Sequence, residues 1–80
     1  MENKIAVITI IVNDISAVDT VNSLLHEYRD YVIGRMGIPY KPKEVNIISV
    51  VLDASQEKIN GLSGKLGMIN GVTSKVLTAK

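Results

Sequence analysis

The apolar positions of the chain alternate between strand-like and helix-like spacing. Residues 4–12 and 45–53 are dominated by Ile and Val at both odd and even positions. Strands that carry apolar side chains on both faces are typical of the centre of a sheet. Two shorter β-branched segments, residues 31–38 and 72–78, predict a second and a fourth strand.

Two segments have apolar residues at helical spacing on one side only. The first predicts a helix over residues 17–29, capped by Asp14 or Ser16, and Ser16 with Asp19 resembles a capping box. The second begins after a Ser55 cap and contains three internal or terminal glycines, of which Gly67 is a candidate C-cap. The apolar stripes are Val18, Val21, Leu25 and Tyr28 in the first helix, and Ile59, Leu62, Leu66 and Ile69 in the second.

This order of elements predicts one α+β domain, residues 1–80, with a ferredoxin-like βαββαβ fold. Right-handed crossovers place both helices on one face of a four-stranded antiparallel sheet. The expected strand order is fourth, first, third, second, which makes the first and third strands central. Residues 38–44 contain Pro39 and Pro42, so we expect strand pairing to end there in a turn.

The predicted sheet has two apolar faces, but two helices on one side cover only one of them. An exposed apolar face of that size is unusual on a monomer. We therefore expect a second copy to cover it, giving a homodimer. Pairing of the unprotected second strand across a two-fold axis would extend the sheet and give a homotetramer.

The second strand contains Gly34, Arg35 and Gly37, which a strand interior normally avoids. One interpretation is an edge strand whose charge, glycines and Pro39 discourage aggregation. The other is that the glycines let a ligand or another backbone approach Arg35, whose planar guanidinium suits a carboxylate or a phosphate.

Composition narrows the classes of function. The net charge of +1 favours neither nucleic acid nor an anionic membrane as a partner, and no apolar run reaches the length of a membrane helix. With no Cys and only one His, His26, we expect no disulfide, no metal site and no cofactor. No signal peptide is recognisable, so we expect a cytoplasmic protein.

His26 lies on the polar side of the first helix without a nucleophile beside it, and the glycines of the second helix do not form a phosphate loop. A helix-turn-helix needs two consecutive helices, whereas two strands separate these. We expect neither an enzyme nor a direct reader of DNA.

Three stretches resemble one family of small bacterial proteins, the iron-only hydrogenase system regulators. They are Gly34-Arg35-Met36-Gly37-Ile38-Pro39-Tyr40, residues 45–53, and residues 62–67 with Gly71-Val72. The family is ACT-like and similar to the ligand-binding domain of nickel-responsive repressors. The resemblance implies a ferredoxin-like fold, a homo-oligomer and a regulatory role. If that role is in transcription, we expect another chain to bind the DNA.

ACT-like domains resemble one another in binding a small effector where the loop after the first strand meets a neighbouring subunit. The resemblance implies a ligand-binding site that joins Asn13, Asp14 and Ser16 of one chain to Arg35 and Gly37 of a neighbour. This loop lacks the glycine common in amino-acid-binding ACT domains, and the His and Cys ligands of the nickel-responsive proteins are absent. We expect a small anionic metabolite; the alternative is a structural or adaptor oligomer that binds another protein.

Overall fold

A computed structural model describes residues 2–79 as four strands, two helices and three short 3₁₀ turns. The order along the chain is that predicted from the spacing of apolar residues. The elements are β1 (Asn3–Val12), η1 (Ile15–Ala17), α1 (Val18–Glu27), η2 (Arg29–Tyr31), β2 (Val32–Tyr40), η3 (Lys41–Lys43), β3 (Val45–Ser55), α2 (Gln56–Gly67) and β4 (Val72–Thr78).

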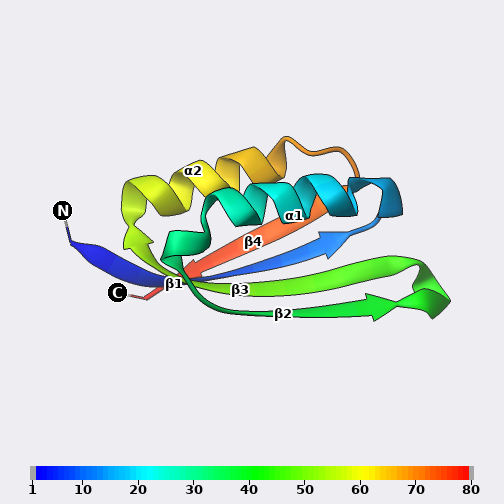
Figure 1. Ribbon diagram of the computed structural model, residues 1–80, viewed down its shortest axis with the longest axis horizontal. Coiled ribbons are helices and arrows are strands. Elements are labelled where there is room, and N and C mark those ends of the chain that lie inside the picture. The colour runs from blue at the N-terminus through cyan, green and yellow to red at the C-terminus, as the bar shows by residue number, and fades with distance from the viewer. Residues whose placement is uncertain (1, 80) are drawn as a thin grey trace.

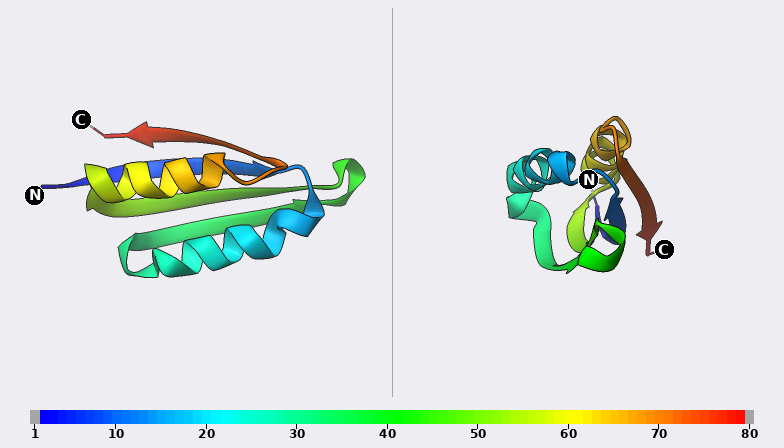
Figure 2. Two further views of the ribbon diagram at one scale, coloured as in Figure 1. Left: turned by 90° about the horizontal axis from the view of Figure 1, so that it is seen from above. Right: turned by 90° about the vertical axis from the view of Figure 1, so that its right-hand side faces the viewer.

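The strands form one antiparallel sheet in the order β2-β3-β1-β4, which confirms the predicted ferredoxin-like topology. Both helices lie on the same face of this sheet (Figure 1). Seen from above, α1 runs along the β2 side and α2 along the side of β1 and β4 (Figure 2). The central position of β1 and β3 explains why both need apolar side chains on each face.

The hydrophobic core lies between the helices and the sheet. Alternate residues of β1 and β3 face the helices and are buried, from Ala6 to Val12 and from Ile48 to Ala54. Both helical stripes meet them, with Leu24 added to the predicted residues of α1. Each fully buried Ile, Leu or Val contributes about 1.5–3 kcal/mol of hydrophobic stabilisation.

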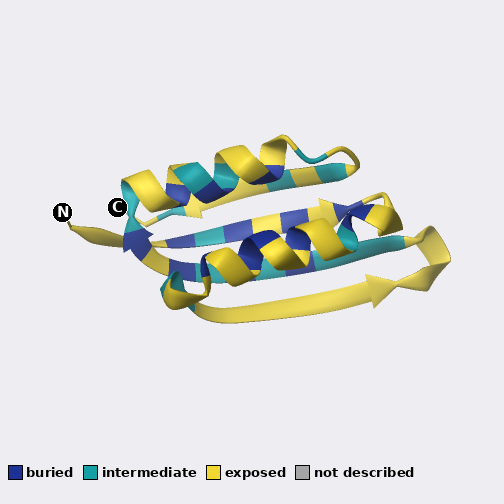
Figure 3. Ribbon diagram, turned by 45° about the horizontal axis from the view of Figure 1, so that its top comes forward, coloured by how far each residue is buried: buried dark blue, intermediate teal, exposed yellow. Residues whose placement is uncertain are grey.

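The opposite side of the sheet, which we call the open face, carries no helix (Figure 1). Burial alternates along β1 and β3, whereas almost all of β2 is exposed (Figure 3). The ladder register assigns these residues to the open face: Ile5, Val7, Thr9, Ile11, Gly34, Met36, Ile38, Tyr40, Val45, Ile47, Ser49, Val51, Asp53, Thr73, Lys75 and Leu77. Most of them are apolar, as the sequence predicts, and a covering second copy stays a prediction at this point.

Some helix boundaries differ from expectation. Asp14, rather than Ser16, is the N-terminal cap, and it caps the η1 turn that precedes α1. The predicted helix over residues 17–29 is the shorter helix α1 with a 3₁₀ turn on either side. Short 3₁₀ turns are common at both ends of α-helices. Ser55 caps α2 as predicted, but Gly67 is its last helical residue and Met68 is the C-cap.

The end of β2 also differs. Pairing with β3 continues through Pro39 and Tyr40, two residues beyond the predicted end of the strand. An edge strand is hydrogen bonded on one side only, so a proline is tolerated there. The turn that follows is shorter than expected and closes on Glu44, which has a left-handed backbone conformation.

Candidate ligand-binding groove

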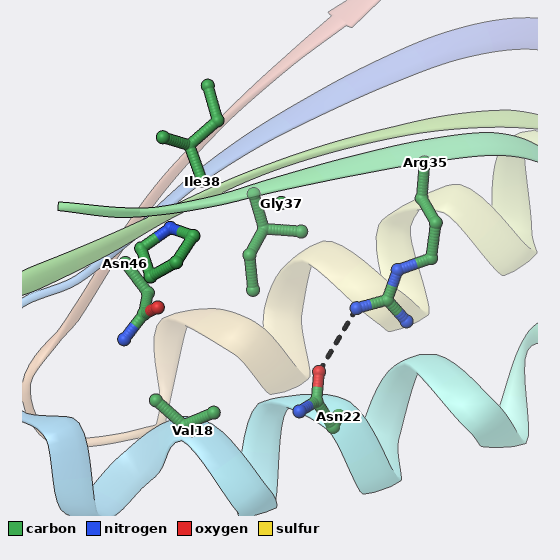
Figure 4. A pocket seen from close by; sticks show the side chains of 8 residues that line it. Val18, Asn22, Arg35, Gly37, Ile38 and Asn46 are labelled. Atoms are coloured by element: carbon green, nitrogen blue, oxygen red, sulfur yellow. Dashed lines mark hydrogen bonds between the residues drawn. The ribbon is translucent and has the colours of Figure 1, made fainter.

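A groove of about 220 Å³ opens between α1 and the β2–β3 edge of the sheet. Two residues of α1 form one wall, β2 forms the other, and β3 supplies the floor (Figure 4). The lining residues are Val18, Asn22, Arg35, Gly37, Ile38, Pro39, Asn46 and Ile48. All three elements belong to one chain, so the groove exists in a single protomer.

Arg35 is the charged residue of this groove. It pairs with Val50 in the ladder, and because the Val50 side chain is buried under the helices, Arg35 also faces them. Its Nη2 donates a hydrogen bond of 3.0 Å to Oδ1 of Asn22 on α1 (Figure 4). The acceptor is an uncharged amide, so this contact holds the guanidinium without neutralising its charge.

Gly37 keeps the groove open beside Arg35. It pairs with Ile48 and shares the helix-facing side of the sheet. A Cβ added at Gly37 would meet no atom within 4 Å, so nothing within the chain requires a glycine there. A strand glycine without an internal reason is typical of a site where a ligand approaches the backbone closely.

The remaining lining is mixed. Ile48 is 5% exposed and forms an apolar floor, beside Val18 and the ring of Pro39. Asn46 pairs with Pro39 and adds a second amide that points toward α1 (Figure 4). The arrangement suits a small ligand with one anionic group and a short apolar part.

The loop after β1 is occupied with local contacts. Asp14 accepts hydrogen bonds from the hydroxyl of Ser16 (2.7 Å) and from its backbone N–H (3.0 Å). Those two bonds, the hydroxyl first, hold the pKa of the Asp14 carboxyl below its ordinary value and keep it anionic. The Asn13 side-chain amide donates to the hydroxyl of Thr73 over 3.4 Å, and its backbone N–H donates to Gly71.

The structure therefore brings together two of the five predicted site residues, Arg35 and Gly37. Asn13, Asp14 and Ser16 lie at the β1–α1 turn beside the start of β4 and do not line the groove. A binding site shared between these three residues and Arg35 of a second chain stays a prediction, because the structure contains one chain.

Sequence reasoning missed Asn22 and Asn46. Asn46 was detectable in principle, because it has the same parity as the core-facing Ile48 and Val50 and is the polar exception among them. Asn22 lies four residues after Val18 on α1 and has no comparable signal. Its importance depends on how α1 sits over β2.

Residues 2–79 contain no group of three or more His, Cys, Asp or Glu side chains arranged to hold a metal ion. His26 lies on the exposed side of α1, where its carbonyl accepts a hydrogen bond from Arg29. No helix in the described part of the chain has the length and apolarity that crossing a membrane requires.

Comparison with known proteins identifies the family. The family model "TM1266-like: Iron-only hydrogenase system regulator, putative" matches residues 4–76, which is nearly the whole chain. The chain belongs to this family. Among solved structures, the chain is similar to the uncharacterized protein TM1266 from Thermotoga maritima, with 36% sequence identity and a TM-score of 0.94. That alignment covers 99% of this chain and 100% of the Thermotoga chain.

A more distant likeness concerns the fold alone. A formyltetrahydrofolate deformylase from Pseudomonas putida KT2440 matches with a TM-score of 0.64 and 18% identity. The match covers 91% of this chain but only 28% of the deformylase, so the shared part is a domain with the ferredoxin-like, ACT-like fold. A search of curated proteins finds no match.

Proposed function

We propose that this TM1266-like protein is a regulatory domain that senses a small anionic metabolite in the α1–β2 groove. One observation supports the proposal above all. Arg35 places an un-neutralised guanidinium at the wall of an apolar-floored groove, with an uncharged amide as its hydrogen-bond partner. A carboxylate or phosphate is the natural partner for such a group, because bidentate charge-assisted bonds are the strongest that arginine forms.

The ligand would join two elements that otherwise share little. A bound anion accepts from the Arg35 guanidinium on β2, while the Asn22 side chain on α1 can turn its N–H₂ group toward the same anion. The apolar part of the ligand would lie on Ile48 and Val18 beside Gly37. Because β2 is an edge strand that is hydrogen bonded on one side only, such a bridge would add a second contact that holds its position.

The regulatory assignment rests on the family. The family is described as regulators of the iron-only hydrogenase system, and we propose that the sensed anion adjusts expression or maturation of that system. Within residues 2–79 no two α-helices follow each other directly to read DNA, so we propose that any effect on transcription passes through another protein. We propose no catalysis, because the residues that line the groove include no His, Asp, Glu, Lys, Tyr or Cys to act as a general acid or base.

A thermal-shift screen of small anions, beginning with inorganic phosphate and short mono- and dicarboxylates, tests the proposal. We expect at least one of them to raise the melting temperature of the wild-type protein. Arg35→Ala should weaken its binding by about 10- to 150-fold, the equivalent of one charge-assisted hydrogen bond. Gly37→Val should also weaken it, by filling the space that the ligand needs.

Matched controls carry the same changes on the other face of the sheet. Lys75→Ala removes a cation from the open face of the other edge strand, and Gly34→Val adds a side chain to the open face of β2. Both should leave anion binding unchanged. A wild-type protein that none of these anions stabilises, or a shift that survives Arg35→Ala, would contradict the proposal.

The second candidate is an adaptor that binds another protein without a small ligand. The unpaired outer edge of β2 favours it, because an exposed edge can accept a strand from a partner. A defined partner that co-purifies in a fixed ratio, and whose binding Arg35→Ala leaves unchanged, would favour the adaptor over the sensor.

A further inference from the structure

The open face has an organised pattern of side chains. One row, Gly34, Val51, Val7 and Leu77, is apolar, and the next is polar at Ser49, Thr9 and Lys75 but has Met36 on β2. The following row returns to apolar residues across β2, β3 and β1 and ends in Thr73 on β4. Leu77 on β4 is 73% exposed and Met36 on β2 is 59% exposed, so both edge strands carry large exposed apolar side chains.

We infer that the open face is a self-association surface, covered by the open face of a second copy that packs sheet on sheet about a two-fold axis. The inference stands apart from the anion groove, which lies on the opposite side of the sheet. Two sheets packed in this way align within about 30° of each other and interdigitate their side chains. Such a contact is isologous, because each copy presents the same surface to the other.

The size of the face is adequate for a dimer. Four strands about 4.8 Å apart and rows that span nine residues of β3, at about 3.4 Å per residue, give roughly 600 Å² per chain. Two such faces bury about 1,200 Å² in total, at the lower end of the range for stable interfaces. Protruding side chains such as Leu77 add to the buried area beyond this flat projection.

Gly34 supports close approach of a partner. It pairs with Val51 on the open face, its backbone needs no left-handed conformation, and a Cβ added there would meet no atom within 4 Å. A β-bulge between Val32 and Gly34 is a local reason for a glycine here, and the space beside its Cα is open. A packed side chain from a second copy would use that space, which a side chain at position 34 would take away.

The chemistry favours a second copy over a different protein. Asp53 and Lys75 are the charged residues of the open face, and both lie toward its margins rather than in the centre. A face with so few charges offers little to select a charged partner, whereas apolar rows on two identical faces match by symmetry. An eighty-residue domain also gains the most from oligomerisation, because one small core buries limited surface.

Sedimentation equilibrium at micromolar concentration tests the inference. The wild-type protein should have the mass of two chains, or of four if β2 edges also pair. The double variant Met36→Lys with Leu77→Lys should weaken the face-to-face contact by roughly 100-fold or more, because it places unpaired ammonium groups in the interface. Met68→Lys, an 85% exposed methionine just after α2, is the matched control and should keep the wild-type mass.

Two outcomes would overturn the inference. In the first, the wild-type protein is a monomer, whether alone or bound to a different protein. In the second, the double variant associates as strongly as the Met68→Lys control. Both substituted side chains are largely exposed within one chain, so the double variant should fold, which circular dichroism verifies. Isotope-filtered NMR between labelled and unlabelled wild-type chains is a second measurement: it should show contacts between Leu77 and open-face methyl groups of the other chain, and their absence would contradict the proposal.

Discussion

Gly71 shows how one residue fixes the turn beside the start of the last strand. Its φ of +79° lies in the left-handed region, and a Cβ there would overlap the side chain of Asp14. We expect Gly71→Ala to destabilise the protein by about 1–2 kcal/mol or more, from the left-handed backbone and the overlap together. Urea unfolding measures the change in free energy.

Gly64→Ala is the matched substitution for this prediction. Gly64 lies inside α2 with open space around its Cα, so alanine should stabilise the protein by about 0.5–1 kcal/mol through helix propensity. Opposite signs for the two Gly→Ala changes are the expected result. Equal effects would mean that the conformation at Gly71 is not the cause.

Asp14 provides a prediction of pH dependence. The Ser16 hydroxyl and then the Ser16 backbone N–H lower the pKa of the Asp14 carboxyl below its ordinary value of 3.8. A lowered pKa in the folded state contributes stability above the ordinary value, and this contribution is lost as the pH falls through the folded pKa. Ser16→Ala should therefore raise the pKa of Asp14 and reduce the loss of stability in acid.

Carboxyl NMR titration measures the Asp14 pKa directly. Ser23→Ala, a serine on the exposed side of α1, is the control and should leave that pKa unchanged. An Asp14 pKa that does not rise in Ser16→Ala would show that the backbone N–H alone supports the carboxylate.

Caps and turn residues were predictable from sequence only in part. The choice between Asp14 and Ser16 depends on which residue has an extended backbone before the first turn, and both have cap-forming side chains. Ser55 was unambiguous because an apolar strand ends at its position and a helical stripe begins after it. A helix cap can therefore be predicted from sequence where only one cap-forming residue is present, but not where two neighbouring residues could both serve.

At the scale of elements, Tyr28, the C-cap of α1, lies close to Gly61 of α2. A Cβ added at Gly61 would lie 3.2 Å from the Tyr28 hydroxyl oxygen, which is closer than side chains normally pack. The helix-propensity gain of Gly61→Ala, up to about 1 kcal/mol, is therefore opposed by this contact. We expect Gly61→Ala to stabilise a Tyr28→Phe background more than it stabilises the wild type.

A double-mutant cycle measures this coupling, which we expect to be a few tenths of a kcal/mol to about 1 kcal/mol. Gly64→Ala in the same two backgrounds is the control, since nothing lies within 4 Å of its added Cβ. Additive effects of Gly61→Ala and Tyr28→Phe would show that the helices shift to accommodate the methyl group without cost.

Element order and sheet order were predictable because they follow from apolar periodicity and the handedness of crossovers. The candidate groove was predictable only to the extent of Arg35 and Gly37, which break the rules of a strand interior. Asn22 reaches the groove because α1 lies above β2 at a particular angle and distance. Packing of side chains in the core determines that placement, and no local pattern records it.

At the scale of the whole molecule, β2 separates two different surfaces. Its helix-facing residues, Arg35 and Gly37, line the groove, while Gly34 and Met36 belong to the open face. Ile38 borders the groove, but its side chain points away from α1 and belongs to the open face (Figure 4). The two proposals therefore rest on alternate side chains of the same strand and can be tested by separate substitutions. A one-residue slip of β2 would exchange the two sets, so its register is decisive for both.

Self-association makes a final prediction about stability. If two folded chains form one dimer, unfolding releases two molecules, and a tenfold rise in concentration adds about 1.4 kcal/mol per dimer to the free energy of unfolding. With an unfolding entropy of about 2.1 cal/mol/K per residue over two eighty-residue chains, the melting temperature should rise by about 4 °C for each tenfold increase in protein concentration.

The Met36→Lys, Leu77→Lys double variant should melt at a temperature independent of concentration, whereas Arg35→Ala should keep the wild-type slope because its side chain faces the groove. Scanning calorimetry over a hundredfold range of concentration measures the slope, and a flat wild-type response would mean that the open face is exposed to water in the folded protein.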